Sequence, residues 1–267
     1  MYEFSFHRPS DLASAEGFLK ADEAKLLAGG QTLIPTLKQR LAAPKHLVDL
    51  SRVEKLTGIE RKGRNIEIGA MMRHAEVAAS AVVEKAIPAL ASLAADIGDP
   101  AVRNRGTIGG SIANNDPSAD YPAACLALNA TIVTNKREIA ANDFFKGLFE
   151  TALEPDEIVV KVRFPIPLQA GYVKFPNPAS RYALVGVFVA KDNEGVRVAV
   201  TGASESGVFR VAAMERVLSR KFAAKALDGI KVDPKDMIAD LHGPADYRAH
   251  LVGVMARRAV EAAIKIK

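Results

Sequence analysis

The sequence predicts a mixed α+β protein that is divided into more than one domain. Short apolar runs typical of strands alternate with amphipathic stretches typical of helices along most of the chain. A composition of 49% hydrophobic and 25% charged residues over 267 positions allows a sizeable core and excludes collagen-like, coiled-coil and disordered classes. Four prolines cluster at positions 165, 167, 176 and 178, which indicates a domain boundary near residue 166.

The first 50 residues are expected to alternate between helix and strand. Residues 11–19 are amphipathic and follow Ser10, a suitable N-cap, which predicts the first helix. An apolar run at 25–28 predicts a strand that ends at Gly29-Gly30. The other elements expected in this part are a helix within 32–41, with Pro35 early in it, and a strand at 46–50.

A second pattern begins at residue 65 and continues to the proline cluster. Alternating apolar residues predict strands at 66–68, 130–134 and 157–164. Helices are expected over 74–95, with an interruption at Pro88, and over 120–128, while 105–111 is expected to be a glycine-rich loop.

The part beyond the proline cluster has a pattern of its own. Two β-rich runs at 183–190 and 196–203 are joined by a turn at 192–195, which predicts a hairpin. A final helix is expected over 246–265. We therefore expect one domain over 1–166 and a second over 167–267.

The excess of basic residues that gives the net charge of +5 lies in the C-terminal part of the sequence. Residues 210–267 contain 12 basic and 7 acidic residues, whereas the preceding 209 residues are neutral overall. Nucleic-acid binding needs a denser basic stripe with aromatic residues for base stacking, so we expect no nucleic-acid partner. Two interpretations of the basic excess stay open: solvated helix faces, or a face that docks a partner subunit.

The single cysteine, Cys125, limits the chemistry that this chain supplies alone. It excludes a disulfide framework and a zinc or iron–sulfur centre held by cysteines of this chain. Its apolar surroundings predict that Cys125 is a small core residue. Because we find neither a targeting sequence nor a long apolar run, we expect a cytoplasmic protein without a transmembrane segment.

Two segments with paired glycines are the main candidates for a binding site. They are Ala28-Gly29-Gly30-Gln31-Thr32 and Thr107-Ile108-Gly109-Gly110-Ser111. Paired glycines let successive backbone amides approach an anion, and the following hydroxyl can donate to the same oxygens, so both segments together suit a diphosphate. A side chain at Gly30 or Gly109 is expected to fill that space. Neither segment matches G-x-G-x-x-G or a Walker A loop, and two plain tight turns are the alternative.

The remaining polar candidates lie after the second glycine segment. Asn114 and Asp120 can hydrogen-bond ligand hydroxyls such as a ribityl chain, although Asp120 is equally suited to cap the helix that follows it. The five histidines are isolated, so we expect no metal site, and we identify no catalytic acid–base pair. The other expectations concern aromatic and basic residues: Phe144, Phe145 and Phe149 in the core, and Arg103 and Arg105 either at the surface or near a phosphate.

Five motifs in order resemble one known family along the whole chain. They are the two glycine segments, the second extended to Arg105, then Asp116-Pro117-Ser118-Ala119-Asp120, Asn177-Pro178-Ala179-Ser180-Arg181-Tyr182-Ala183 and Tyr247-Arg248-Ala249-His250-Leu251. The sequence is similar to the FAD-binding medium subunits of molybdenum hydroxylases. It is most similar to the medium-subunit family of aerobic carbon monoxide dehydrogenase, which is related to the flavin domain of xanthine dehydrogenase.

The resemblance implies a fold and a cofactor site. The fold would be a two-subdomain FAD-binding region of the vanillyl-alcohol-oxidase/PCMH type, with subdomains of about 1–56 and 57–166, followed by a C-terminal α/β domain with a small antiparallel sheet. Residues 28–32 and 107–111 would hold the diphosphate of a non-covalent FAD. Asn114 and Asp120 would contact its ribityl and phosphate portion, Leu27 and Tyr182 its isoalloxazine, and Ile97 its adenine. Gln31 departs from the pattern, because some relatives carry histidine there.

The resemblance also implies partners and a role in electron transfer. Substrate would be oxidised at molybdopterin in a large subunit, and electrons would pass through [2Fe–2S] clusters of a small subunit to FAD and on to an external acceptor. The three chains would form a heterotrimer, commonly doubled to (αβγ)2. Two alternatives stay open: a self-sufficient FAD-dependent oxidoreductase, and a nucleotide-binding assembly module without redox turnover.

Overall fold

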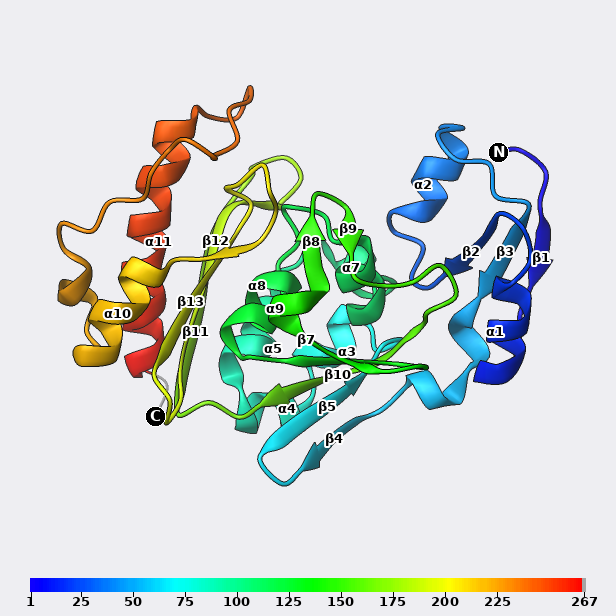
Figure 1. Ribbon diagram of the computed structural model, residues 1–267, viewed down its shortest axis with the longest axis horizontal. Helices are drawn as coiled ribbons and strands as arrows, with labels where there is room; N and C mark the ends of the chain where they lie inside the picture. Colours follow the sequence, from blue (N-terminus) through cyan, green and yellow to red (C-terminus); the bar gives the residue numbers. More distant parts are fainter. Residues whose placement is uncertain (266–267) are drawn as a thin grey trace.

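The computed structural model describes residues 1–265. Its N-terminal part is a small parallel sheet with helices (Figure 1). Its strands are β1 (Ser5–His7), β2 (Ala24–Leu27) and β3 (His46–Asp49), in the order β1-β3-β2. Helix α1 (Leu12–Leu19) follows β1, and its N-cap is Asp11, whose carboxylate accepts from the Ser14 amide at 2.8 Å. The prediction of Ser10 as the cap was therefore wrong by one residue. Helix α2 spans Leu33–Lys38, and two short 3-10 turns, η1 (Leu50–Arg52) and η2 (Glu54–Leu56), lead onward.

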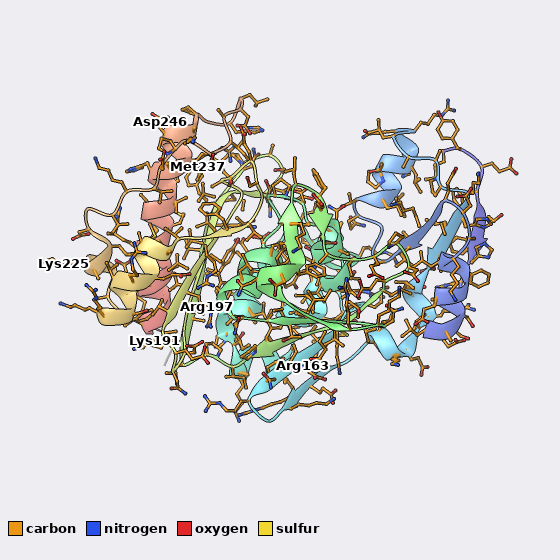
Figure 2. All side chains as sticks on the ribbon, in the orientation of Figure 1. Arg163, Lys191, Arg197, Lys225, Met237 and Asp246 are labelled. Carbon is orange, nitrogen blue, oxygen red and sulfur yellow. The ribbon has the colours of Figure 1, made fainter. Side chains whose placement is uncertain are left out.

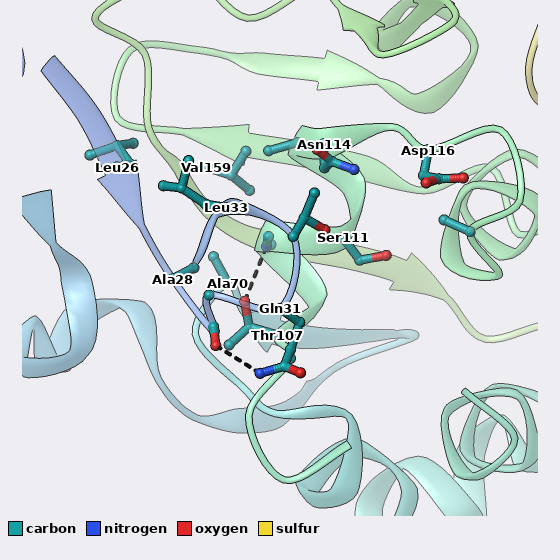
Figure 3. Close-up of a pocket in the computed structure, with 18 of the residues that line it drawn as sticks. Leu26, Ala28, Gln31, Leu33, Ala70, Thr107, Ser111, Asn114, Asp116 and Val159 are labelled. Carbon is teal, nitrogen blue, oxygen red and sulfur yellow. Dashed lines mark hydrogen bonds between the residues drawn. The ribbon is translucent and has the colours of Figure 1, made fainter. Parts of the chain in front are cut away.

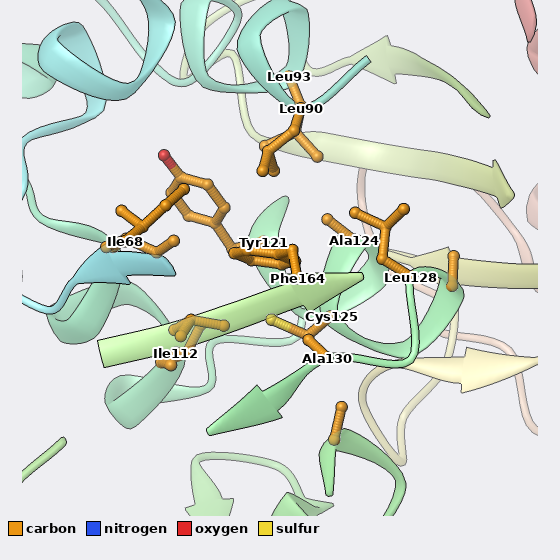
Figure 4. Packing of buried hydrophobic residues seen from close by; sticks show 14 of the residues in the cluster. Ile68, Leu90, Leu93, Ile112, Tyr121, Ala124, Cys125, Leu128, Ala130 and Phe164 are labelled. Atoms are coloured by element: carbon orange, nitrogen blue, oxygen red, sulfur yellow. The ribbon is translucent and has the colours of Figure 1, made fainter. Parts of the chain in front are cut away.

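The second sheet has five antiparallel strands. They are β4 (Ile59–Lys62), β5 (Asn65–Gly69), β10 (Val159–Pro165), β6 (Thr131–Thr134) and β7 (Glu138–Ala140), in that spatial order. Alternate apolar residues such as Ile68 and Phe164 face the helices and are fully buried. Cys125 lies in the same core, which confirms its predicted place (Figure 4).

The helices over this sheet are shorter than the sequence predicted. Residues 74–95 form three helices, α3 (His74–Ala78), α4 (Ala81–Ala86) and α5 (Pro88–Ala95). The break at Pro88 was predicted, but the break at Ser80 was not. Ser80 interrupts the helix because its hydroxyl accepts from the Val83 amide at 3.4 Å and caps α4. Three further helices follow, α6 (Pro100–Arg103), α7 (Ile108–Asn114) and α8 (Tyr121–Ala127).

A short helix and a hairpin connect β7 to β10 of this sheet. They are α9 (Ala141–Phe144), β8 (Phe145–Gly147) and β9 (Glu150–Thr151). Phe144 is fully buried as predicted, but Phe149 at the hairpin tip is 56% exposed, so its predicted core position was wrong. The helical spacing of the phenylalanines has no structural meaning here, because the helix ends at Phe144.

The C-terminal part is a third sheet packed against two helices. Strands β11 (Gln169–Pro176), β12 (Ala183–Lys191), β13 (Val196–Thr201) and β14 (Phe209–Arg210) are antiparallel and lie in this order. Helices α10 (Ala212–Arg220) and α11 (Ala245–Lys265) cover one face, together with the turn η3 (Ala224–Leu227). Gly171 allows α11 to approach β11, because a Cβ there would stand 2.1 Å from the Ala259 carbonyl oxygen.

Strand β12 is buried on both faces. Val185, Val187 and Val189 face α10 and α11, whereas Phe188 and Ala190 belong to the core that contains α5 and α8. Helices α5 and α8 thus lie between the five-stranded sheet and the C-terminal sheet (Figure 1). The predicted α+β class is confirmed.

Most basic residues of the C-terminal part are exposed. Lys225 lies at the outer end of the molecule, far from the five-stranded sheet that carries Arg163 (Figure 2). Lys174 and Arg248 are buried. Arg248 is only 3% exposed and donates to the carbonyl oxygens of Leu184 and Gly202, both at 2.8 Å. Among residues 1–265, no helix combines the length and the apolar character needed to cross a membrane.

Candidate flavin-binding site

One large cavity of about 670 Å³ collects most of the residues that the sequence singled out (Figure 3). It lies where the N-terminal sheet, the central helices and the loop before β12 meet. The predicted residues that line it are Ala28, Gly29, Gly30, Gln31, Thr32, Ile97, Thr107, Gly109, Gly110, Ser111, Asn114, Asp120 and Tyr182. Leu27 and Ile108 are not among its lining residues, and Ile108 is fully buried in the core.

The first glycine segment connects β2 to α2 and carries unused backbone donors. Gly30 has φ +74°, a left-handed conformation that turns the chain over the cavity. None of the hydrogen bonds within residues 1–265 uses the amides of Gly29, Gly30, Gln31 or Thr32. Four consecutive amides without a protein acceptor beside a cavity are suited to an anion. The Gln31 side chain folds back, with Nε2 donating to the Gly29 carbonyl at 3.5 Å (Figure 3).

The second glycine segment is the first turn of helix α7 instead of a loop. Its N-cap is Thr107, whose hydroxyl accepts from the Gly110 amide at 3.1 Å. The amides of Ile108 and Gly109 donate to the carbonyl oxygens of Met72 and Ala70, at 3.0 and 2.8 Å. Since these amides already have acceptors in the protein, the second segment does not form the nest that the sequence predicted.

Side chains on the next turn of α7 supply polar groups in place of those amides. Ser111 and Asn114 both line the cavity, and neither side chain makes a hydrogen bond within the described residues. Figure 3 shows both of them, together with Thr107 and Gln31, around the same space. The two glycine segments therefore contribute differently: the first offers backbone amides and the second offers a hydroxyl and an amide side chain.

One end of the cavity is formed around Ile97. Arg103 donates to the carbonyl oxygens of Ile97 and Gly98, at 3.1 and 3.0 Å, so it clamps this turn. His74 lines the same region and is 5% exposed, and its Nδ1 has no partner within the described residues. Burial, assisted by repulsion from Arg103, lowers the pKa of His74 to about 4, so the imidazole is neutral at physiological pH.

Asp120 lies deep in the cavity wall and is paired with charged and polar side chains. Its Oδ1 accepts from the Tyr172 hydroxyl at 2.5 Å and from the Lys174 ammonium at 3.1 Å. Although Asp120 is the residue before α8, its side chain makes no capping hydrogen bond, so the capping alternative was wrong. Burial raises the pKa of the Asp120 carboxyl, and the Lys174 charge opposes that rise.

Tyr182 lines the cavity and is 48% exposed. It follows a tight loop in which the Asn177 carboxamide oxygen accepts from the amides of Ala179 and Ser180, at 2.9 and 3.2 Å. Arg181, directly before Tyr182, has φ +62°. This loop fixes the backbone from which the Tyr182 ring extends.

Sequence reasoning missed several residues of the site. Asp116 lines the cavity and lies inside a motif that was singled out, so it had a local signal. His74 also lines it but was set aside as an isolated histidine. Tyr172 and Lys174 had no signal at all, because their role depends on strand β11 lying against the ends of α5 and α8.

Residues 2–167 match a protein family described as "FAD binding domain in molybdopterin dehydrogenase". The chain belongs to this family. This membership confirms the resemblance that was inferred from the five motifs. It also confirms that the family binds FAD and consists of oxidoreductases.

Relatives of this FAD-binding family match the chain over nearly its full length. It is 35% identical to the carbon monoxide dehydrogenase medium chain of Hydrogenophaga pseudoflava, over 97% of this chain and 96% of that protein. It is 36% identical to the nicotine 6-hydroxylase medium subunit of Paenarthrobacter nicotinovorans, over 94% of each chain. A chain in the structure of reconstituted CO dehydrogenase from Oligotropha carboxidovorans superimposes with a TM-score of 0.90 at 32% identity, covering 99% of each chain.

The cavity fits the cofactor of the family. Ligand sites for molecules of this size have volumes of roughly 300–1,000 Å³, and this cavity has about 670 Å³. The free amides of residues 29–32 and the unbonded Ser111 hydroxyl suit a diphosphate. Asp120, with one oxygen unbonded, suits a hydroxyl-bearing chain.

Proposed function

We propose that this chain is the FAD-carrying electron-transfer subunit of a molybdenum-containing hydroxylase. The observation that carries the proposal is the row of four amides at Gly29, Gly30, Gln31 and Thr32 that have no acceptor within residues 1–265, beside a cavity of about 670 Å³. When bound, FAD supplies the redox chemistry, and the protein supplies binding, orientation and electrostatics.

Specific roles follow for the residues of the cavity. The amides of 29–32 hold the diphosphate, helped by the hydroxyls of Thr32 and Ser111. Asn114 and Asp120 hold the ribityl portion, Ile97 lies at the adenine end, and Tyr182 covers the isoalloxazine. Leu27 has less support, since it lies beside the cavity and not among its lining residues. The flavin is held non-covalently.

The partner chains follow from the relatives, which are medium chains or subunits by name. We propose a large molybdopterin subunit and a small [2Fe–2S] subunit, assembled as (αβγ)2, with electrons passing from the iron–sulfur clusters through FAD to an external acceptor. One cysteine, fully buried at position 125, leaves the clusters to another chain. A cytoplasmic location remains the prediction from the sequence.

The proposed domains follow the sheets. The proposed subdomain of about 1–56 contains the three-stranded sheet, that of about 57–166 contains the five-stranded sheet and the small β8–β9 sheet, and residues 167–267 contain the four-stranded sheet. Support comes from the strand bounds, because β10 ends at Pro165 and β11 begins at Gln169.

The test is reduction of the bound flavin after purification with the native partner chains. We expect the flavin absorbance to bleach when the reduced iron–sulfur subunit is mixed with this chain. Bleaching of the isolated chain by an organic substrate would instead support the self-sufficient oxidoreductase. Bound flavin that accepts no electrons from the partner would support the assembly module.

A further inference from the structure

Asp120 presents its two carboxylate oxygens to different surroundings. Oδ1 accepts from Tyr172 at 2.5 Å and from Lys174 at 3.1 Å, while Oδ2 makes no hydrogen bond within the described residues. The residue is 4% exposed and lines the cavity. One oxygen is thus occupied by the protein, and the other is left for a ligand.

Lys174 is a buried cation on strand β11 of the C-terminal sheet. Its side chain is 1% exposed, and Nζ donates to the Asp96 carbonyl oxygen at 2.7 Å as well as to Asp120. The Asp96 carboxylate is 3.7 Å from Nζ. The carbonyl of Asp96 is at the C-terminal end of α5, where a cation is favoured. A lysine is rarely buried unless its charge is paired, so this placement has a defined counter-ion.

The same C-terminal sheet also holds the backbone that leads to Asp120. The Thr201 hydroxyl at the end of β13 shares its one proton between the carbonyl oxygens of Pro117 and Ala119, which lie 3.0 and 2.6 Å from Oγ1. The Gly202 amide donates to the Pro117 carbonyl at 2.8 Å. Both the carboxyl group and its backbone are therefore held by strands outside residues 2–167, the segment that matches the flavin-binding family.

We propose that Lys174 is a positioning residue of the flavin site, which holds Asp120 ionised and turned so that Oδ2 accepts a hydrogen bond from a hydroxyl of FAD. This inference rests on the proposed function and deepens it. Lys174 acts through Asp120, since it is not among the residues that line the cavity. The C-terminal sheet therefore completes the cofactor site.

The groups around Asp120 make Lys174 decisive for its charge. They are Tyr172 and Lys174 from β11, Asp96 after α5, Tyr121 on α8, and Tyr182 beyond the loop. Lys174 is the one cation of the described residues that forms an ion pair with Asp120. Without it, burial and the Asp96 charge both favour the protonated carboxyl.

The experiment measures the dissociation constant of FAD as a function of pH for the full chain and its variants. In Lys174→Met, Asp120 should take up a proton at higher pH than in the wild type. FAD binding should therefore be about tenfold weaker at neutral pH, because a charged acceptor bonds a hydroxyl more strongly than a neutral one. Affinity should recover as pH rises, with a midpoint above that of the wild type, and Lys174→Arg should restore much of the wild-type profile.

Matched variants separate charge from packing. Asp120→Asn combined with Lys174→Met removes both charges, leaves no unpaired buried ion and should bind FAD weakly without any pH-dependent recovery. Tyr172→Phe removes a neutral donor to the same oxygen and should raise the midpoint less than Lys174→Met does, because the Lys174 charge lowers the pKa of Asp120 more than the Tyr172 hydrogen bond does. Circular dichroism of each apo-variant checks that it is folded.

Two results would overturn the inference. One is a Lys174→Met profile that matches the wild type, and the other is a uniform loss that is the same in Lys174→Met and the double variant at every pH. Failure of the proposed function looks different, because the folded wild-type chain would then bind no FAD at all.

Discussion

Gly29 and Arg105 lie in backbone contact, so that a Cβ on Gly29 would stand 2.2 Å from the Arg105 carbonyl oxygen. This contact joins the segment after β2 to the segment before α7, which are far apart in the sequence. It therefore holds the two walls of the cavity together. The first glycine of the pair is needed for this approach, whereas the second, Gly30, provides the left-handed turn.

A methyl group at position 29 should separate the two walls. We expect Gly29→Ala to lower the free energy of unfolding by about 1–3 kcal/mol, because backbone atoms cannot move aside as a flexible side chain does. FAD affinity should fall as well, since the amides of 29–32 shift. Thermal unfolding and FAD titration measure the two effects. Gly17→Ala is the control, because a Cβ at Gly17 meets nothing within 4 Å; equal behaviour of both variants would refute the contact.

Gly109→Val should weaken the apo-protein itself. A Cβ at Gly109 would stand 2.5 Å from the Cβ of Ala70 and 2.7 Å from its carbonyl oxygen, so the clash lies in the protein and not in ligand space. We expect a loss of about 1–3 kcal/mol in unfolding free energy without FAD. A variant whose apo-stability is unchanged, but which has lost FAD, would instead support the reason expected from the sequence.

His74 should make the protein less stable in mild acid. Burial first, and then Arg103, lowers its pKa from 6.5 to about 4, so the unfolded chain binds a proton that the folded chain does not between these values. The stabilisation is present above pH 6.5 and is lost as the pH falls toward 4. Denaturant unfolding near pH 5 should find His74→Leu more stable than the wild type by about 1–2 kcal/mol. Parallel pH profiles of the two proteins would contradict the assignment.

Glu67 should stabilise the five-stranded sheet only in its charged form. Burial alone would raise the pKa of Glu67, but hydrogen bonds from Lys161, Arg163 and Lys62, at 2.6, 2.9 and 3.0 Å, lower it from 4.5 to about 2. Its contribution is complete above pH 4.5 and disappears as the pH falls to about 2.

The matching variant is Glu67→Gln, measured by denaturant unfolding at two pH values. At pH 7 it should reduce the free energy of unfolding by about 1–3 kcal/mol, as expected for lost bonds to a charged group. The difference should shrink toward pH 2. A difference that stays constant with pH would show that the charge of Glu67 has no role.

Elements with a strong local signal were predicted from the sequence. The hairpin of β12 and β13, the long helix α11 and the strand β3 lie close to their predicted bounds, because alternation and turn residues are local properties. Short strands such as β1 and β4, and helix α10, were missed. The paired glycines at 109 and 110 suggested a loop, but the Thr107 cap and the bonds to Met72 and Ala70 hold them in a helix.

Some residues of the site could be predicted from the sequence and others could not. The lining by residues 28–32, Ser111 and Asn114 could be predicted, because these residues lie within motifs. Nothing in the sequence near Lys174 indicates that its ammonium lies buried between Asp96 and Asp120. That contact depends on how β11 packs against α5 and reaches the residue before α8, which is a property of the tertiary structure.

The most direct test is a titration of the purified, folded chain with FAD, in which binding is measured by the quenching of flavin fluorescence. We predict saturation at one FAD per chain for the wild type and for Gly17→Ala. We predict a large loss of affinity for Gly30→Val, because a β-branched residue disfavours the left-handed backbone conformation, φ +74°, that position 30 adopts. Absence of saturable FAD binding by the folded wild-type chain would contradict the assignment of this cavity as a flavin site.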